Sequence, residues 1–291
     1  MKIGRLLIII CLLIIITQIT SAQNGIRLEL VLEKTQFFQG EEITCEAVVS
    51  NVSNVELKVI EPSNQVGCTY KLFNEKGEEI KYTGPYYSGT WPKFNLKPGD
   101  KLFYIDNISK LFGTKSIEIF DQILDTGHYI LYAHYWSGNG DTANAKTSFD
   151  VNTPKGKDKL AYNDITNIIK ERKSNLISTI ELFVSKEQDF AQKYPNSIYT
   201  PIVLSNMSAY LYMPLKQENR AIEIRKHILE NYPDYVAVNQ GLLDSKPVSE
   251  LSDEEKKIFI KKVYKRAKSK FAHLVIEKYS QKHKLKIDFE K

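Results

Sequence analysis

The spacing of apolar residues changes once along this chain, near Pro154, and that change limits the possible folds more than any other feature. Before it, apolar and polar residues alternate, beginning with Ile26, Leu28 and Leu30. Alternation places every second side chain on one face of a β-strand. After Asp158, apolar residues recur at intervals of three and four, as in amphipathic helices. Examples are Ile165, Ile168, Ile169, Leu176, Ile180, Phe183 and Val184. We therefore predict a multidomain, all-β plus all-α protein.

Chain length and turn residues suggest where the domains begin and end. The 291 residues, 42% of them hydrophobic and 26% charged, are enough for two folded domains. Between residues 26 and 151, clusters of Gly, Pro, Asn and Asp separate about seven to nine short strands, which favours a β-sandwich. The expected division is a signal peptide at 1–22, a β-sandwich at 23–153, a linker at 154–157 and a helical domain at 158–291.

Three turn motifs in the β-region carry a family resemblance. They are Gln39-Gly40-Glu41-Glu42, Leu96-Lys97-Pro98-Gly99-Asp100 and Asp125-Thr126-Gly127-His128-Tyr129. This pattern resembles the immunoglobulin-like domains of secreted bacterial proteins, here of a Bacteroidetes type, including the BsuPI-like proteinase inhibitors. The resemblance covers residues 26–151 and implies an N-terminal immunoglobulin-like β-sandwich.

Two similar segments in the helical region carry a second resemblance. Each has Tyr-Pro followed by Asn or Asp, at Tyr194-Pro195-Asn196 and Tyr232-Pro233-Asp234. The two prolines are 38 positions apart, which is close to the tetratricopeptide period of about 34 residues. With Ala221 at a helix-contact position, residues 160–236 resemble one or two degenerate tetratricopeptide repeats. The resemblance implies a C-terminal α-helical, tetratricopeptide-like region.

A capping motif marks the start of the last predicted helix. Ser252 is followed three residues later by Glu255, the pattern of a capping box. The apolar stripe then continues without interruption, so we expect a single helix from Ser252 to Val275. Its members are Ile260, Val263, Tyr264, Ala267, Phe271, Leu274 and Val275.

The first 22 residues have the three parts of a secretory signal peptide. Lys2 and Arg5 form a basic head, the run from Leu6 to Ile16 is apolar, and a polar exit ends at Ala22. The apolar run is too short for the roughly 30 Å core of a bilayer, so we expect cleavage before Gln23. The alternative is an uncleaved anchor. Cleavage implies an exported protein that is periplasmic, at the cell surface or secreted, without a remaining membrane span.

Two cysteines remain after the expected cleavage, Cys45 and Cys68. Strand alternation turns both thiols toward an apolar interior, and exported proteins meet an oxidising environment. A disulfide between them would close a loop of about 24 residues and stabilise the fold by roughly 3 kcal/mol. Two buried free thiols fit the same pattern equally well.

Charge divides along the chain in the same way as the apolar spacing. Residues 23–153 contain 12 basic and 17 acidic residues, whereas residues 154–291 contain 26 basic and 18 acidic residues. A basic helical region can attract lipid headgroups or acidic glycans, although lysines on helices are usually a solvated face. The lysines lack interleaved aromatic residues and the protein is expected to be exported, so we expect no nucleic-acid partner.

Motifs for catalysis, metals and nucleotides are missing from the sequence. No H-E-x-x-H, C-x-x-C, G-x-S-x-G, P-loop or G-x-G-x-x-G pattern occurs. His128 and His134 project to the same strand face, but at a spacing too wide for one metal without a further ligand. We therefore expect a non-enzymatic protein without cofactor, metal or catalytic residues.

Aromatic residues on loops supply the candidate binding site. Tyr86, Tyr87 and Trp91 lie in a stretch broken by Gly and Pro, and Trp136 ends a predicted strand. Exposed aromatic residues suit protein or sugar partners, whereas buried ones would fill the end of the core. The sequence predicts an envelope protein that binds a protein or glycan partner. The alternative is a BsuPI-like proteinase inhibitor, with the loop from Tyr82 to Trp91 entering the protease cleft.

Overall fold

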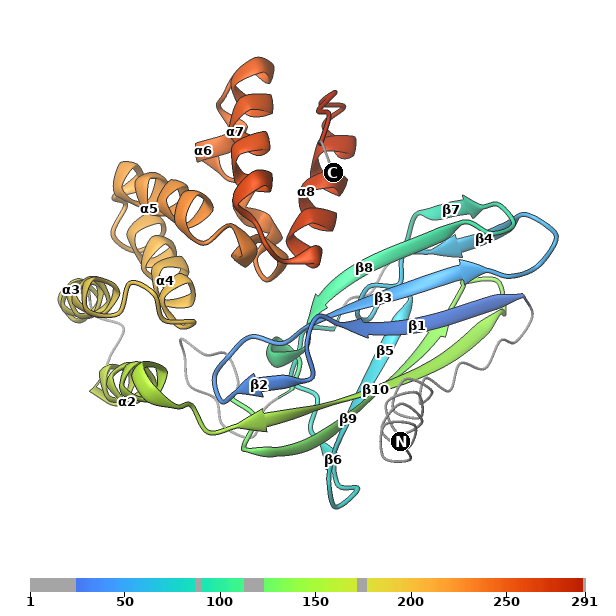
Figure 1. Cartoon of the computed structure of the whole chain (residues 1–291), viewed down its shortest axis with the longest axis horizontal. Coiled ribbons are helices and arrows are strands. Elements are labelled where there is room, and N and C mark those ends of the chain that lie inside the picture. The colour runs from blue at the N-terminus through green and yellow to red at the C-terminus, as the bar shows by residue number, and fades with distance from the viewer. Residues whose placement is uncertain (1–24, 87–90, 113–122, 172–176, 290–291) are drawn as a thin grey trace, which may run out of the picture. The chain divides into compact units, whose positions relative to one another are not determined.

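A computed structural model describes residues 25–86, 91–112, 123–171 and 177–289 (Figure 1). In these residues a β-rich region from Ile26 to Asn152 is followed by helices from Gly156 to Lys282. The order agrees with the change of apolar spacing. Contacts divide the described chain into two compact units, one built mainly before residue 153 and the other mainly after it. The first helix begins at Gly156, within the stretch expected to be a linker.

The larger sheet of the β-unit contains the long hairpin β9–β10. In this sheet the strand order is β2-β10-β9-β5-β6. Strand β9 pairs antiparallel with β10 on one side and with β5 on the other. The strands are β2 (Gln36–Phe38), β10 (Thr142–Asn152), β9 (Gly127–Trp136), β5 (Cys68–Asn74) and β6 (Glu79–Ile80).

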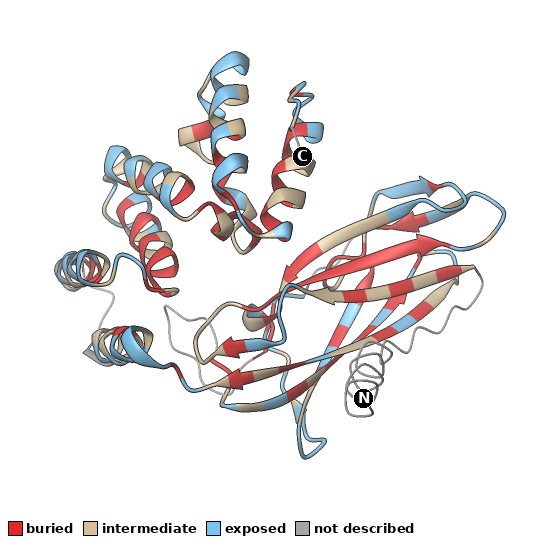
Figure 2. Cartoon of the chain, in the orientation of Figure 1, coloured by how far each residue is buried: buried red, intermediate tan, exposed pale blue. Residues whose placement is uncertain are grey.

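A second sheet has the order β1-β3-β8, and a short two-stranded sheet pairs β4 with β7. Figure 2 shows that β3 is buried along its whole length, whereas β1 alternates between buried and half-buried residues. The strands are β1 (Ile26–Leu32), β3 (Thr44–Asn51), β8 (Lys101–Asn107), β4 (Leu57–Ile60) and β7 (Lys93–Leu96), and a short 3-10 helix, η1 (Ile108–Lys110), follows β8.

One hydrophobic core joins the inner faces of the two larger sheets. Leu28 and Leu30 of β1 belong to the same buried cluster as Leu72 of β5 and Leu131 of β9. Each alternates with outward-facing neighbours, which is why the sequence spacing of two produces a sheet with one apolar face. Full burial of a Leu side chain contributes about 1.5–3 kcal/mol, so this cluster is the main source of stability in the β-unit.

The two cysteines lie in this core on opposite sheets. Cys45 of β3 and Cys68 of β5 are free thiols in the structure and are buried. The disulfide considered from the sequence is therefore not formed in this structure. Both thiols point into the core, as the strand alternation predicts. Burial raises the pKa of both thiols well above the ordinary value, and the nearby Asp106 carboxylate raises it further.

The helical unit begins with four longer helices that pack on their sequence neighbours. In α4 eight residues are buried, so this helix lies at the centre of the unit. None of the helices in the described parts of the chain is both long and apolar enough to cross a membrane. The elements are α2 (Gly156–Glu171), α3 (Ile177–Lys193), α4 (Thr200–Tyr212), α5 (Glu218–Asn231), the 3-10 helices η2 (Pro233–Ala237) and η3 (Gln240–Leu242), α6 (Lys246–Ser249), α7 (Asp253–Arg266) and α8 (Lys270–Lys282).

The two Tyr-Pro segments end two of these helices. Helix α3 stops immediately before Tyr194, and α5 stops immediately before Tyr232. A proline cannot continue the backbone hydrogen-bond ladder, so each helix must end near this point. The Tyr232 hydroxyl donates a hydrogen bond to the Pro195 carbonyl at 2.6 Å, which ties the two segments together.

The expected single C-terminal helix is wrong, because the chain forms two helices, α7 and α8. The capping box at Ser252 and Glu255 is confirmed. However, α7 ends at Arg266, and Ala267 is extended with a ψ of 140°. Asp234 Oδ1 accepts hydrogen bonds from the backbone N–H groups of Lys268 and Ser269, at 2.6 and 2.8 Å. A carboxylate distant in sequence therefore stabilises the break between α7 and α8, although the apolar stripe continues across it.

Candidate functional site

Two of the predicted aromatic candidates, Tyr86 and Trp136, are exposed and do not fill the end of the core. The exposed fraction is 77% for Tyr86 and 48% for Trp136, whereas Trp91 is half-buried. Tyr87 lies outside the described residues. Tyr86 packs against the ring of Tyr82, with 5.1 Å between the ring centroids. Trp136 is the last residue of β9.

Trp136 shares its strand face with a larger set of outward-facing residues. Strand alternation brings Ile130, Tyr132 and His134 of β9 to that same outer face of the sheet. The register places Lys71 of β5 directly beside Tyr132, and Thr69 beside His134. This outer face is the strongest candidate site in the β-unit, since it gathers aromatic, basic and hydrogen-bonding side chains.

Tyr132 lies at the centre of this face and is 40% exposed. The ring of Phe73 meets it edge-on, with 5.4 Å between centroids and an interplanar angle of 86°. On the other side, the Lys146 ammonium lies 6.0 Å from the centre of the Tyr132 ring. Lys146 is the residue of β10 that pairs with Tyr132. An aromatic ring held in this way offers a flat apolar surface, and the Lys146 ammonium lies over it.

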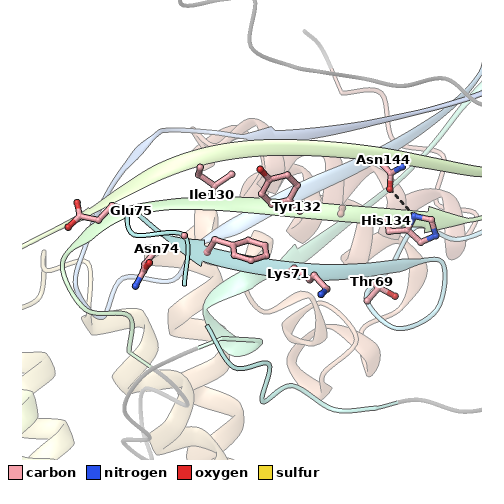
Figure 3. Close-up of a pocket in the computed structure, with 11 residues that line it drawn as sticks. Thr69, Lys71, Asn74, Glu75, Ile130, Tyr132, His134 and Asn144 are labelled. Carbon is pink, nitrogen blue, oxygen red and sulfur yellow. Dashed lines mark hydrogen bonds between the residues drawn. The ribbon is translucent and has the colours of Figure 1, made fainter. Parts of the chain in front are cut away.

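A groove of about 540 Å³ runs along this face (Figure 3). Its volume falls within the range of small-ligand sites, about 300–1,000 Å³. Its walls are the outward side chains of β5 and β9, the turn after β5, and one residue of β10. They comprise Thr69, Lys71, Phe73, Asn74, Glu75, Gly77, Ile130, Tyr132, Ala133, His134 and Asn144.

The polar side chains of the groove differ between its two ends. At one end His134 Nδ1 lies 2.8 Å from Asn144 Oδ1, so the imidazole donates there and its Nε2 atom can accept a hydrogen bond (Figure 3). At the other end the turn after β5 carries acidic groups, including Glu75. Between them Lys71 forms an exposed ion pair with Glu79 at 3.3 Å. A ligand would therefore meet polar groups at both ends of the groove and at Lys71, and apolar side chains in the middle.

Buried residues on the inner face of β9 fix the strand whose outer face forms the groove. Tyr129 stacks on Phe149 at 5.7 Å, and the Tyr129 hydroxyl donates to the Asp125 carbonyl. Burial raises the pKa of Tyr129 to about 12. Tyr135 is fully buried and donates to the Ile60 carbonyl at 2.8 Å. Because these side chains are packed and hydrogen-bonded, β9 presents Tyr132 and His134 on a rigid base.

No metal centre is found within the described residues, where no group of three or more His, Cys, Asp or Glu side chains could hold a metal ion. His128 and His134 do share one strand face, as expected. Each has a separate partner, because His128 Nδ1 lies 2.7 Å from Asp150 Oδ1 and His134 contacts Asn144. The arrangement suits binding through hydrogen bonds and ring contacts.

A second cavity of about 440 Å³ lies in the helical unit. It is bounded by α3, α4 and α5, with Tyr232 at one end. Gln192, Arg220 and His227 supply polar groups, and Met207 supplies apolar surface. This cavity is smaller and lacks an exposed aromatic ring comparable to Tyr132.

The sequence pointed to Trp136 but missed the centre of the site. In the segment from His128 to Trp136, tyrosines occupy both alternating sets of positions, so aromatic content alone does not distinguish the outer face. The informative feature of the sequence is that His128, Tyr132 and His134 occupy positions of the same strand face. Two polar side chains on one face indicate that this face is exposed.

Comparison with known proteins finds similarity to solved structures at low sequence identity only. No protein-family model and no curated protein matches the sequence. One similar solved structure is a CARDB domain from Pyrococcus furiosus in complex with di-metal ions, at 12% identity, with 44% of this chain and 94% of that chain covered and a TM-score of 0.25. Another is the sporulation control protein Spo0M from Bacillus subtilis, at 14% identity, 50% and 56% coverage and a TM-score of 0.29.

A third is a β-glucosidase from Listeria innocua, at 14% identity, with 44% of this chain and 16% of that chain covered and a TM-score of 0.27. At these identities and TM-scores, none of the three likenesses carries an argument about activity or ligand. The chain is thus a β-rich unit followed by a helical unit, and its candidate site is argued from its own residues.

Proposed function

We propose that this chain is an exported, non-enzymatic binding protein whose β-unit holds a saccharide in the groove over β5, β9 and β10. The observation that carries the proposal is Tyr132, an exposed ring at the centre of a groove bordered by hydrogen-bonding side chains. The apolar face of a sugar ring packs on an aromatic ring, while its hydroxyl groups need donors and acceptors nearby. Thr69, His134 and Asn144 supply those groups.

The proposal includes a finer description of the two units. The β-unit is an immunoglobulin-like sandwich, supported by two sheets around one core and by the turn motifs. The helical unit is tetratricopeptide-like, supported by helices that end at Tyr194 and Tyr232. In this arrangement the helical unit serves as a scaffold for a second partner in the cell envelope, and the β-unit binds the saccharide.

Substitution of Tyr132 tests the saccharide site. We expect Tyr132→Ala to weaken saccharide binding at least about fivefold, because loss of a central aromatic contact at a binding hot spot costs more than about 1 kcal/mol. Tyr86→Ala is the matched control, since Tyr86 is an exposed tyrosine on a different segment. Calorimetric titration of the mature chain with neutral and acidic hexose oligomers measures both variants. Equal losses in the two variants, or no binding by the wild-type chain, would contradict the proposal.

The inhibitor alternative uses the other exposed aromatic residue. Tyr86 is 77% exposed in the segment that was expected to enter a protease cleft. If the chain were an inhibitor, Tyr86→Ala would weaken inhibition of at least one protease and Tyr132→Ala would not. Assays against serine, cysteine and metalloproteases therefore distinguish the two functions with the same pair of variants.

A further inference from the structure

We propose that the ligand of the groove is an acidic saccharide, one whose sugar rings carry carboxylates. The inference rests on the proposed saccharide site and adds the charge of its ligand. It starts from the row of side chains that crosses the sheet at Tyr132. In that row Lys71 of β5 and Lys146 of β10 are the two residues paired with Tyr132 in register.

The register places one cation on each side of the ring. Directly paired residues on neighbouring strands have Cβ atoms about 4.5–5.5 Å apart, so both lysine side chains start close to Tyr132. All three are on the outer face, because their neighbours Tyr70, Leu131 and Ala145 are buried on the inner one. A sugar that contacts Tyr132 would therefore lie beside Lys71, which lines the groove, and near the Lys146 ammonium over the ring.

Both lysines can supply their charge to a ligand. Lys71 pairs with Glu79, but their side chains are 58% and 50% exposed. Exposed ion pairs of this kind are weak, so Lys71 can also pair with a ligand carboxylate. The Lys146 ammonium lies over the Tyr132 ring, 6.0 Å from the ring centre. A ligand carboxylate can therefore approach it from the same side as a stacked sugar.

The β-region around the two lysines is acidic overall, so a pair of lysines beside Tyr132 indicates a local site for an anion. Residues 23–153 contain 12 basic and 17 acidic residues, so the unit does not attract anions in general. Glu75 at the turn end of the groove also repels a carboxylate. We therefore expect the ligand carboxylates to lie beside Lys71, Tyr132 and Lys146, between the turn that carries Glu75 and the pair His134–Asn144.

Esterification of the ligand provides the sharpest test, because it removes charge and keeps the sugar backbone. The probes are galacturonate oligomers and their methyl esters, titrated into the mature wild-type chain and into Lys146→Gln, Lys71→Gln and Lys97→Gln. Lys97→Gln is the matched control, since Lys97 is an exposed lysine in the turn between β7 and β8. Each measurement is repeated at about 0.05 M and about 0.5 M salt, because added salt screens exposed charges.

We expect the acid to bind at least about tenfold more tightly than the ester at low salt, and high salt to reduce this preference. Lys146→Gln and Lys71→Gln should each weaken binding of the acid about three- to tenfold and leave the ester unchanged. Lys97→Gln should behave as wild type.

Three results would overturn the inference, each in a distinguishable way. Equal affinity for acid and ester, with no effect of Lys71→Gln or Lys146→Gln, removes the acidic ligand and leaves the saccharide site in place. Equally tight binding of poly-glutamate shows a general polyanion site. Absence of binding by both sugars contradicts the saccharide site itself, and the acidic ligand with it.

Discussion

At the scale of single residues, Tyr132 and Tyr135 show how one strand separates binding from stability. They lie three positions apart on β9, so their side chains point to opposite faces of the sheet. Tyr135 is fully buried and hydrogen-bonded to Ile60, and burial raises its pKa above the ordinary value. Tyr132 is exposed in the groove. A change at Tyr135 should therefore affect folding, and a change at Tyr132 should affect binding.

The two cysteines provide a prediction at the same scale. We expect a mature chain that begins at Gln23 to react slowly with an aromatic disulfide reagent at pH 8 while folded, because burial raises both thiol pKa values and excludes the reagent. After unfolding under non-reducing conditions, Cys45 and Cys68 should both react. A count of zero would show that the protein carries the disulfide instead.

Asp164 of α2 predicts how acid affects the helical unit. It accepts hydrogen bonds from Lys193 Nζ at 2.7 Å and from the Tyr194 hydroxyl at 2.6 Å. The Lys193 hydrogen bond, followed by that of Tyr194, holds the pKa of this carboxyl below its ordinary value of 3.8. The ionised form is thus favoured by folding. Its contribution is fully present above the ordinary pKa and is lost as the pH falls through the lowered value.

We therefore expect Asp164→Asn to be slightly less stable than wild type at pH 7, and the difference to disappear as the pH drops well below 3.8. The effect is small because the pair is exposed. Urea unfolding at several pH values measures it. A difference that grew toward low pH would contradict the assigned sign.

At the scale of elements, the break between α7 and α8 depends on a residue outside both helices. Asp234 of η2 accepts the N–H groups of Lys268 and Ser269, and the Ser269 side chain then caps α8 by accepting from the Ala272 N–H at 3.0 Å. His273 Nε2 lies 3.1 Å from the Ala267 carbonyl, close to the end of α7. The broken segment thus keeps its backbone groups satisfied.

Removal of that carboxylate should destabilise the helical unit. We expect Asp234→Ala to lower the free energy of unfolding by about 0.5–1.5 kcal/mol, the net contribution of a typical hydrogen bond, because the two backbone donors can reach water when the carboxylate is removed. Asp244→Ala is the control, because Asp244 is an exposed carboxylate that pairs with Lys282 near the end of α8. Chemical denaturation followed by circular dichroism compares the two. Equal stability of both variants would show that the break does not depend on Asp234.

The same elements show what the sequence could predict. Apolar spacing located the change from strands to helices, and Ser252 with Glu255 located a helix start, because both signals are local. The α7–α8 break could not be found locally, since Phe271 continues the stripe of Val263 and the acceptor lies some 30 positions earlier. Likewise, Tyr132 became a candidate only when strand pairing placed Lys71 and Lys146 beside it.

At the scale of the whole molecule, the two units differ in charge as well as in fold. Residues 154–291 contain 26 basic and 18 acidic residues, in contrast with the acidic balance before them. Six of these basic residues belong to α7, and one of them, Lys262, pairs with Glu230 of α5 at 3.0 Å. The helical unit therefore uses part of its basic charge internally, and the proposed acidic ligand is explained by Lys71 and Lys146.

Export is a prediction for the whole chain. We expect the protein recovered from the envelope or medium of the cells that produce it to begin at Gln23, because the small residues Thr20 and Ala22 suit signal peptidase. Residues 1–22 lie outside the described structure. Intact-mass measurement and N-terminal sequencing identify the first residue. A chain that still begins at Met1 would contradict cleavage.

The alternation of strand β9 also determines how this protein can change over evolutionary time. Substitutions at Ile130, Tyr132 or His134 alter the groove and leave the buried tyrosines of the same strand in place. Insertion or deletion of a single residue would instead exchange the two faces and remove the core and the groove together. Descendants that keep the length of β9 can therefore diverge in the ligand they bind while inheriting the same fold.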